Sequence, residues 1–453
     1  MLVSWVLFPV VMLAVWAGCG LAVTRLTPGG LPRGLVLPVG FAAAIAIASL
    51  ATATEPTARL AAPAVLAVTI VGFLVAEDRR AWVPDRWAAA AALGVFLVFG
   101  APVLATGTAT FTGYIQLDDI ATWLAITDQA LQRGRDLSGL EASTFRQVLR
   151  DYLPAGYPVG GFLPLGLGHE LTLGRDVAWL FAPTMALTAG LLSLVLTEIV
   201  RPVIARPWAR AAVAFVAAQS ALLVAYAEWG AIKEVTASLL VALIAALAPT
   251  LAGSWRQVLP LGVAIAAIIA SLSLGGGAWV IPIVLVALLG ARVRPQSLPA
   301  PTVVLTGLVL VLSVPSLLLA RSFLRPAASS VLSASTELGN LRGPLPATHL
   351  LGIWPAGDFR TSPDQAAITT ILLVVLVLAA IGGLGLAVQR RAGALIGYAA
   401  GGLLACGLLA SRGSPWVDAK AMATAGPMVL TLGLAALAFV ATERFRPAAR
   451  RAA

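Results

Sequence analysis

Long runs of apolar residues dominate this sequence and restrict what it can fold into. The runs 3–23 (VSWVLFPVVMLAVWAGCGLAV) and 366–388 (AAITTILLVVLVLAAIGGLGLAV) contain no charged residue. A helix needs roughly 20 such residues to cross the hydrocarbon core of a bilayer. Only helices and closed barrels satisfy their backbone polar groups in lipid, and these runs lack the alternation of a barrel strand. The sequence therefore predicts an all-α polytopic membrane protein.

The same criterion places about thirteen spans along the chain, whose mean hydropathy is +0.94. The pair on either side of Gly275–Gly277 could instead be re-entrant. The first block lacks a basic leader and a small-residue cleavage site, so we expect a retained helix rather than a signal peptide. The predicted spans are 3–23, 34–53, 60–76, 87–106, 177–200, 211–227, 235–252, 257–274, 277–291, 302–320, 367–388, 393–410 and 422–441.

The distribution of charge predicts the orientation. With these spans, 17 of the 30 Lys and Arg residues but only 5 of the 20 acids fall on the side that holds the C-terminus. The positive-inside rule then puts the C-terminus in the cytoplasm and the N-terminus outside a plasma membrane. Orientation accounts for the net charge of +10, so no nucleic-acid partner is expected. Cys19 and Cys406 lie far apart in predicted spans and suggest neither a disulfide nor a metal site.

This topology divides the chain into five regions and gives the outer face its long polar segments. Two shorter outer turns are 226–234 and 411–420. The chemistry of the protein is therefore expected on the outer face. The regions are the N-terminal spans 1–106, the outer segment 107–176, the central spans 177–320, the outer segment 321–366 and the C-terminal spans with a basic tail, 367–453.

The first outer segment contains two adjacent aspartates, Asp118 and Asp119, in the stretch GYIQLDDIATWLAITDQALQRG. Apolar residues at helical spacing predict a short amphipathic helix on the membrane surface that begins at one of them and stops at Gly134. A second such helix is predicted at 143–153. An aspartate at a helix start can serve as a cap. Capping does not account for a second, adjacent aspartate. We consider three roles for it at the water–lipid boundary: a general base, part of a site for a substrate phosphate, or part of a metal site.

The stretch LDDIATWLAITDQALQRG, followed by YLPAGYPVGGFLPLGLGHEL, resembles the GT-C superfamily of integral membrane glycosyltransferases. The resemblance covers roughly 107–290 in organisation. It implies a GT-C-like fold with interfacial helices in the first large outer loop and Asp118 or Asp119 as the catalytic carboxylate. It also implies a polyprenyl-phosphate sugar donor, a cell-envelope glycan or lipid as acceptor, and transfer on the extracytoplasmic face.

Such a transfer needs a carboxylate to accept the proton of the acceptor hydroxyl and cations to meet the leaving phosphate. A divalent metal could supply part of that positive charge, and the sequence leaves this open. No residue is assigned as a metal ligand.

Several further residues on the outer side are candidates for substrate binding. Glu228, Lys233 and Glu234 in EWGAIKE either pair with one another at the membrane boundary or place Lys233 against the donor phosphate. The loop 338–360 (LGNLRGPLPATHLLGIWPAGDFR) is either a lid over the site or a structural plug. Asp418 and Lys420 are weaker candidates for acceptor contacts. The remaining candidates are Tyr157, His169, Glu170, Arg342, His349, Trp354, Asp358 and Arg360.

Two other functions remain open at this point. A transporter or flippase of a lipid-linked envelope precursor would need ionisable residues within the spans or broken helices near the midplane. The predicted spans contain almost no ionisable residues, although SLSLGGGAWV (271–280) could be a helix break. A non-catalytic scaffold would bind the same lipid without turnover.

Overall fold

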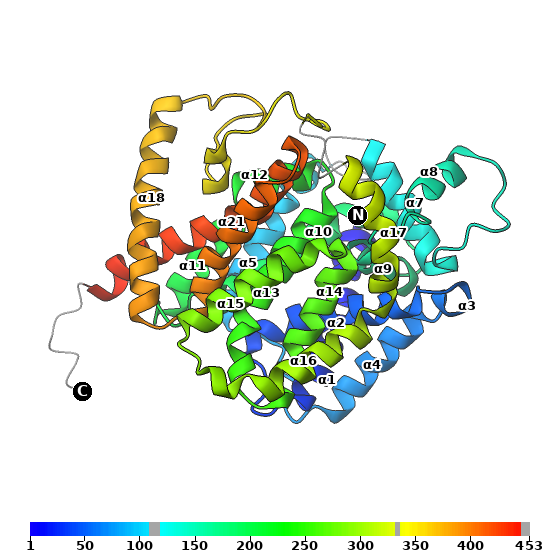
Figure 1. Ribbon diagram of the computed structural model, residues 1–453, viewed down its shortest axis with the longest axis horizontal. Coiled ribbons are helices and arrows are strands. Elements are labelled where there is room, and N and C mark those ends of the chain that lie inside the picture. Colours follow the sequence, from blue (N-terminus) through cyan, green and yellow to red (C-terminus); the bar gives the residue numbers. More distant parts are fainter. Residues whose placement is uncertain (108–117, 331–335, 445–453) are drawn as a thin grey trace.

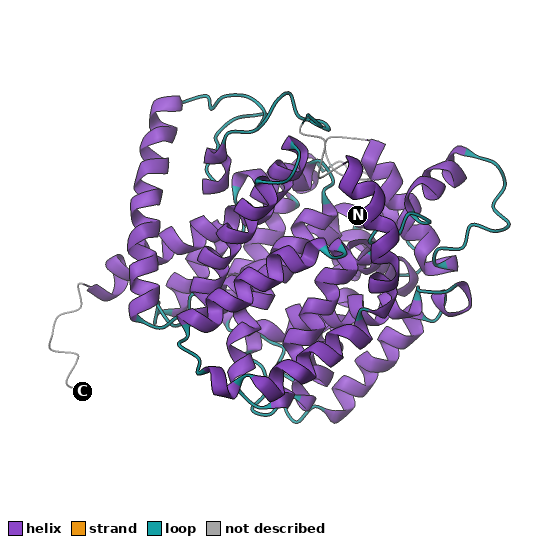
Figure 2. Ribbon diagram, viewed as in Figure 1, coloured by secondary structure: helices purple, strands orange, loops and turns teal. Residues whose placement is uncertain are grey.

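A computed structural model describes residues 1–107, 118–330 and 336–444 of the chain. The side chains of residue 118, of 324–330 and of 443–444 lie outside this description. The described residues form helices joined by turns and loops, and no strand occurs among them (Figure 2).

Within the described ranges, nine helices are long and apolar enough to cross a membrane. They are α1 (Phe8–Leu26), α2 (Arg33–Ala51), α3 (Glu55–Ala58) with α4 (Ala61–Val75), α10 (Val177–Ile199), α13 (Ile232–Leu247), α14 (Leu259–Leu272), α18 (Ala366–Gln389), α19 (Gly393–Ile396) with α20 (Gly402–Ala410), and α21 (Pro415–Phe439). Two bent pairs bring the number to eleven: α11 (Pro207–Ala217) with α12 (Ala221–Glu228), and α16 (Pro299–Leu312) with α17 (Val314–Ser330). The prediction of an all-helical multi-pass membrane protein is confirmed.

The expected count of thirteen exceeds this number because two predicted spans form short helices. These are α5 (Arg86–Phe99) and α15 (Gly275–Gly290), with 14 and 16 residues. At 1.5 Å per residue they extend about 21 and 24 Å, less than the roughly 30 Å of a bilayer core. Every one of the thirteen predicted positions falls on a helix or on a bent pair. The remaining short helices are α6 (Ala101–Thr106), α7 (Asp118–Arg133), α8 (Thr144–Tyr152) and α9 (Leu163–Leu171).

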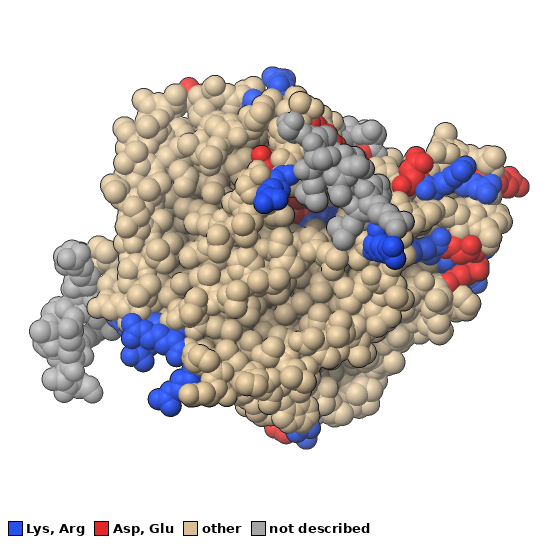
Figure 3. Space-filling view, in the orientation of Figure 1, with Lys and Arg blue, Asp and Glu red and all other residues tan. Residues whose placement is uncertain are grey.

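Charged residues lie mainly near two opposite ends of the molecule. On the face drawn in Figure 3, the band between these ends is almost free of Lys, Arg, Asp and Glu. One end, which we call the loop end, holds α7, α8 and residues 336–365 (Figure 1). The other, the arginine end, holds the turns 27–32 and 76–85, which are joined by the ion pairs Arg25–Glu77 (3.1 Å) and Arg33–Asp78 (3.4 Å).

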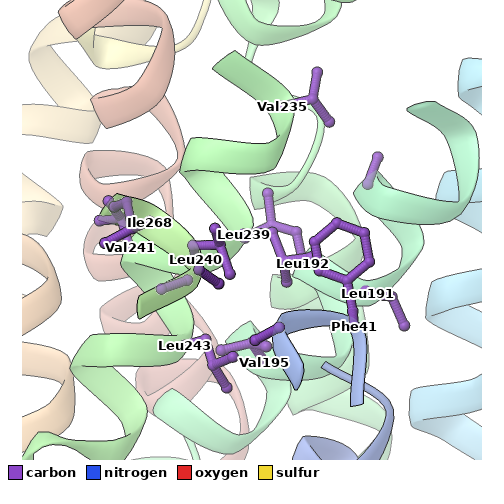
Figure 4. Packing of buried hydrophobic residues seen from close by; sticks show 14 of the residues in the cluster. Phe41, Leu191, Leu192, Val195, Val235, Leu239, Leu240, Val241, Leu243 and Ile268 are labelled. Atoms are coloured by element: carbon purple, nitrogen blue, oxygen red, sulfur yellow. The ribbon is translucent and has the colours of Figure 1, made fainter. Parts of the chain in front are cut away.

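The core is centred on α10, whose apolar span is completely buried among its neighbours. In Figure 4, Leu192 of α10 lies between Phe41 of α2 and Leu239 of α13, and Val195 of α10 lies beside Leu243 of α13. In lipid, close packing rather than the exclusion of water holds helices together. Small residues permit that approach here, since a Cβ added at Gly40 of α2 would overlap the backbone of Trp16 in α1.

In contrast, α18 stands at the edge of the molecule (Figure 1). Only 22% of its apolar span is buried, and it packs chiefly along α21. Its outer face carries exposed Ile371, Leu378 and Ile381. This surface suits contact with lipid.

Candidate functional site

A cavity of about 260 Å³ opens at the loop end, where α7, the turn between α12 and α13, and the start of α21 meet. It combines charged side chains with a largely aromatic wall. The charged residues that line it are Asp119, Lys233, Glu234 and Lys420, and the aromatic ones are Trp123, Tyr157, Tyr226, Trp229, Trp279, Phe323 and Trp416. Four of the predicted site residues (Asp119, Tyr157, Lys233 and Glu234) are therefore brought together.

Helix α7 positions Asp119. It begins at Asp118 and ends before Gly134 (φ +61°), as predicted, so Asp119 lies in the first turn, where the helix dipole favours a negative charge. The side chain of Asp118 lies outside the described part of the chain. The apolar face of α7 packs on protein rather than on lipid: Ile126 and Leu131 are buried, and Gly166 of α9 leaves room for Leu131.

Gly230 permits the approach of α13 to α7. It has a φ of +80°, which favours glycine, and a Cβ added there would lie 2.5 Å from the side chain of Ile120. Because Ile120 follows Asp119 directly and Gly230 precedes Lys233 by three residues, this contact brings the two charged residues to one cavity.

Lys233 contacts an aromatic ring rather than a carboxylate. Its Nζ lies 4.1 Å from the centroid of the Tyr157 ring, a cation–π contact. Among the side chains that the structure describes, Lys233 forms no ion pair. Tyr157 stacks in turn on Trp123 of α7 at 5.5 Å, and burial among these groups raises the pKa of Tyr157 well above its ordinary value.

Glu234 is paired across the cavity. Its Oε1 lies 3.5 Å from Nζ of Lys420, and this ammonium also lies 4.7 Å from the ring of Trp416, one turn earlier on α21. The Glu234 side chain is only 12% exposed. Lys420, considered a weaker candidate from the sequence, thus takes a central place.

A second aromatic group forms the wall away from α7. The ring of Tyr226 lies 5.9 Å from that of Trp416 and 5.6 Å from that of Phe359. The hydroxyl of Tyr226 is buried without a hydrogen-bond partner among the described residues. Trp229 and Trp416 also line the cavity, and they were not named from the sequence as candidate site residues. Each lies within four residues of a lysine in a short outer turn.

The loop 338–360 packs beside this wall and does not line the cavity. Arg360 donates to both carboxylate oxygens of Asp358, at 2.9 and 2.7 Å, and its guanidinium lies 4.9 Å from the ring centroid of Trp229. The Arg360 hydrogen bonds lower the pKa of Asp358 to about 2, and Asp358 raises that of Arg360. Arg342 lies 3.7 Å from the same carboxylate.

Within this loop, the buried His349 lies against the partly buried Trp354. Their ring centroids are 3.9 Å apart, and His349 is 1% exposed. Neither ring nitrogen of His349 has a hydrogen-bond partner among the described residues, and burial lowers its pKa to about 4. Trp354 donates through Nε1 to the carbonyl of Thr361 (3.0 Å). Both residues were expected to contact substrate, but neither His349 nor Trp354 lines the cavity.

The other predicted binding residues lie elsewhere. His169 lies in the last turn of α9, where its Nδ1 contacts the carbonyl of Arg175 (2.9 Å), and Glu170 is exposed. Glu228, the last residue of α12, does not line the cavity. In the described ranges, no group of three His, Cys, Asp or Glu side chains is arranged to hold a metal ion.

Arg135 does not line the cavity, but it holds the segment that carries Tyr157 in place. It was not named from the sequence as a candidate. Its guanidinium donates to the carbonyls of Leu153 (2.9 Å) and Tyr157 (2.7 Å). Burial lowers the pKa of Arg135 to about 10. These bonds fix the turn that presents the Tyr157 ring to Lys233.

No protein-family model matches this chain, and no curated protein is similar to it. The geometry alone therefore indicates the chemistry. The cavity offers two carboxylates, Asp119 and Glu234, two ammonium groups, Lys233 and Lys420, and flat aromatic faces; Glu234 is paired with Lys420. This set suits a ligand that carries a phosphate, a hydroxyl and a ring with apolar faces.

Proposed function

We propose that this protein is a membrane glycosyltransferase of the GT-C type. It moves a sugar from a polyprenyl-phosphate donor to a cell-envelope glycan or lipid acceptor. The observation that carries the proposal is the cavity that joins Asp119 with Lys233 and Lys420. The aspartate was proposed as base and Lys233 as phosphate contact from the sequence, and the two share one cavity although 114 positions separate their numbers.

The reaction is a single displacement at the anomeric carbon. A carboxylate of the Asp118–Asp119 pair accepts the proton of the acceptor hydroxyl, and the hydroxyl oxygen forms the new bond to that carbon. The bond between the carbon and the phosphate oxygen breaks, and its electron pair leaves with the polyprenyl phosphate. Lys233 and Lys420 stabilise the phosphate, while the rings of Trp229 and Trp416 stack on the sugar.

The proposal includes a topology. All thirteen apolar helices and bent pairs cross the plasma membrane, with the N-terminus outside and the C-terminus in the cytoplasm. In this topology α6 extends the short α5, and the bilayer thins locally around the short α15. The loop end then faces the extracytoplasmic side, where polyprenyl-linked sugars meet their acceptors. The concentration of arginine at the opposite end supports this orientation.

Purified protein supplied with a panel of polyprenyl-phosphate monosaccharides and an envelope fraction tests the activity. The readouts are released polyprenyl phosphate and sugar bound covalently to the acceptor. Asp119→Asn or Asp118→Asn is expected to lower turnover about a hundredfold or more, since a general base contributes that much. Asp128→Asn, on the same helix but outside the cavity, is the matched control. Wild-type turnover in both Asp118→Asn and Asp119→Asn would exclude the carboxylate pair as the base.

One feature favours transport of a lipid-linked precursor as a second candidate function. The α11–α12 pair bends by 54° and the α16–α17 pair by 71°, and broken helices are common at transporter sites. Flux of a polyprenyl-linked sugar through proteoliposomes without a covalent product would favour this function over the first.

A further inference from the structure

A second cavity, of about 210 Å³, lies at the arginine end and shares no lining residue with the first. It is enclosed by the start of α2, the start of α5, the end of α10 and the second turn of α11. Its charged residues are Arg33, Asp85, Glu198, Arg201 and Arg210. Three arginines around one small cavity are unusual in a chain with so few charges.

The two acids of this cavity are already engaged. The Asp85 carboxylate accepts from the backbone N–H groups of Trp87 (2.9 Å) and Ala88 (3.1 Å) and so caps α5. The Glu198 carboxylate is paired with Arg201 at 3.2 Å. It also lies against Gly34, where an added Cβ would come within 2.8 Å of Oε1.

The arginines are engaged to different degrees. Arg33 reaches outward to Asp78 at 3.4 Å, in an exposed pair that contributes little. Arg210 forms no ion pair with any described side chain, and its Nε is buried without a hydrogen-bond partner. A buried guanidinium N–H without a partner is costly, so an acceptor from a ligand would be bound strongly there.

Two tryptophans place this cavity at the level of lipid headgroups. Trp87, in the first turn of α5, is 42% exposed, and Trp208, in the first turn of α11, is 45% exposed. Exposed tryptophan on a membrane protein is typical of the interface between the bilayer and water. Basic cavities between helices at this level hold anionic headgroups in other membrane proteins.

We propose that this cavity binds the phosphate of a membrane phospholipid through Arg210, with Arg33 and Arg201 beside it. The site is separate from the sugar-transfer site and needs no turnover. Free inorganic phosphate offers the same oxygens, but it would gain nothing from the exposed tryptophans. The lipid is therefore the occupant that these observations favour.

Native mass spectrometry of the full chain in detergent tests the site by counting the lipids retained. Phosphatidylglycerol is expected to bind as one tightly held copy, and diacylglycerol with the same chains is expected to be lost. Arg210→Gln is expected to weaken phosphatidylglycerol binding about tenfold or more, since a charge-assisted hydrogen bond is removed. Arg201→Gln changes an exposed side chain of the same cavity and serves as a second variant.

The matched control is Arg294→Gln, which removes one exposed charge at the same end but outside the cavity. Equal weakening in Arg294→Gln would indicate non-specific attraction and overturn the proposal. Equal retention of diacylglycerol by the wild-type protein would also overturn it, whether or not Arg210→Gln folds. Displacement of the lipid by an equal concentration of inorganic phosphate would assign the site to free phosphate instead.

Discussion

At the scale of single residues, the few ionisable side chains of the loop end are held in distinct charge states. Asp358 is kept ionised by the guanidinium of Arg360. His349 is kept neutral, because it lies buried against Trp354 and no described residue accepts a hydrogen bond from its ring. On acidification, His349 therefore takes up its proton near pH 4, before Asp358 does near pH 2.

His349 predicts a dependence of stability on pH. Its folded pKa of about 4 lies below the ordinary value of 6.5, so the unfolded chain binds the proton more readily. The stabilising contribution is complete above pH 6.5 and is lost as the pH falls from there toward 4. Thermal unfolding in detergent is expected to show a lower Tm at pH 5 than at pH 7. His349→Phe, which keeps a ring against Trp354, is expected to reduce that difference.

The control for this prediction is His169, the other histidine of the chain. His169→Phe is expected to leave the pH dependence as in the wild type. If His349→Phe loses as much stability between pH 7 and pH 5 as the wild type does, the buried neutral histidine is not the cause.

At this scale the sequence predicted part of the candidate site. Asp119, Lys233 and Glu234 were expected because charged residues beside apolar runs are conspicuous. Of the aromatic wall only Tyr157 was expected, because Trp229 and Trp416 look like ordinary interfacial residues. The pairing of helix ends around the cavity depends on packing between segments that are distant in the sequence. The contact of Gly230 with Ile120 is of this kind, and no pattern in the residues around either one predicts it.

At the scale of helices, the apolar runs predicted where the helices lie, but they did not predict where two of the spans are bent. The helix predicted at 143–153 is observed as α8, and Ser143 caps it by accepting from the N–H of Arg146 (3.2 Å). The predicted spans 211–227 and 302–320 are each broken, near Ser220 and Ser313. One serine scarcely changes the mean hydropathy of an apolar run. A prediction based on hydropathy therefore does not detect the bend.

The contact of α15 with the segment 393–401 gives a prediction at this scale. Gly393, Gly397 and Gly401 follow one another at four-residue spacing and lie against α15, where a Cβ on Gly397 would come 2.5 Å from that of Ala287. Gly397→Val is expected to lower the free energy of unfolding by about 1–3 kcal/mol through overpacking. Thermal unfolding measures the change.

The matched control is Gly382→Val on α18, where no atom lies within 4 Å of an added Cβ. It is expected to leave the Tm close to that of the wild type. A larger loss of Tm in Gly382→Val than in Gly397→Val would contradict the assignment of the tight contact to α15.

At the scale of the whole molecule, the loop end and the arginine end are chemically different, and this predicts which reagents reach them. Ala142 is exposed at the loop end, and Gln296 is exposed in the turn before α16. In intact cells, a membrane-impermeant maleimide is expected to label Ala142→Cys and to spare Gln296→Cys until the membrane is opened. Cys19 and Cys406 are buried and should contribute little background.

Labelling of both introduced cysteines from the same side would contradict the division of the molecule into two faces. The reverse pattern would keep the division but invert the orientation. In that case the loop-end cavity, and the sugar transfer proposed for it, would face the cytoplasm.

The cavity at the loop end also has a consequence for how the protein is made. Asp119 comes from α7, Lys233 and Glu234 come from α13, and Lys420 comes from α21, the last long helix among the described residues. The ribosome delivers these parts in that order, and domains assemble as the chain emerges. Until α21 has entered the membrane, Glu234 lacks the ammonium of Lys420 and one wall stands open. A nascent chain would thus carry Asp119 long before the cavity is complete, so the proposed sugar transfer could begin only when synthesis is nearly complete.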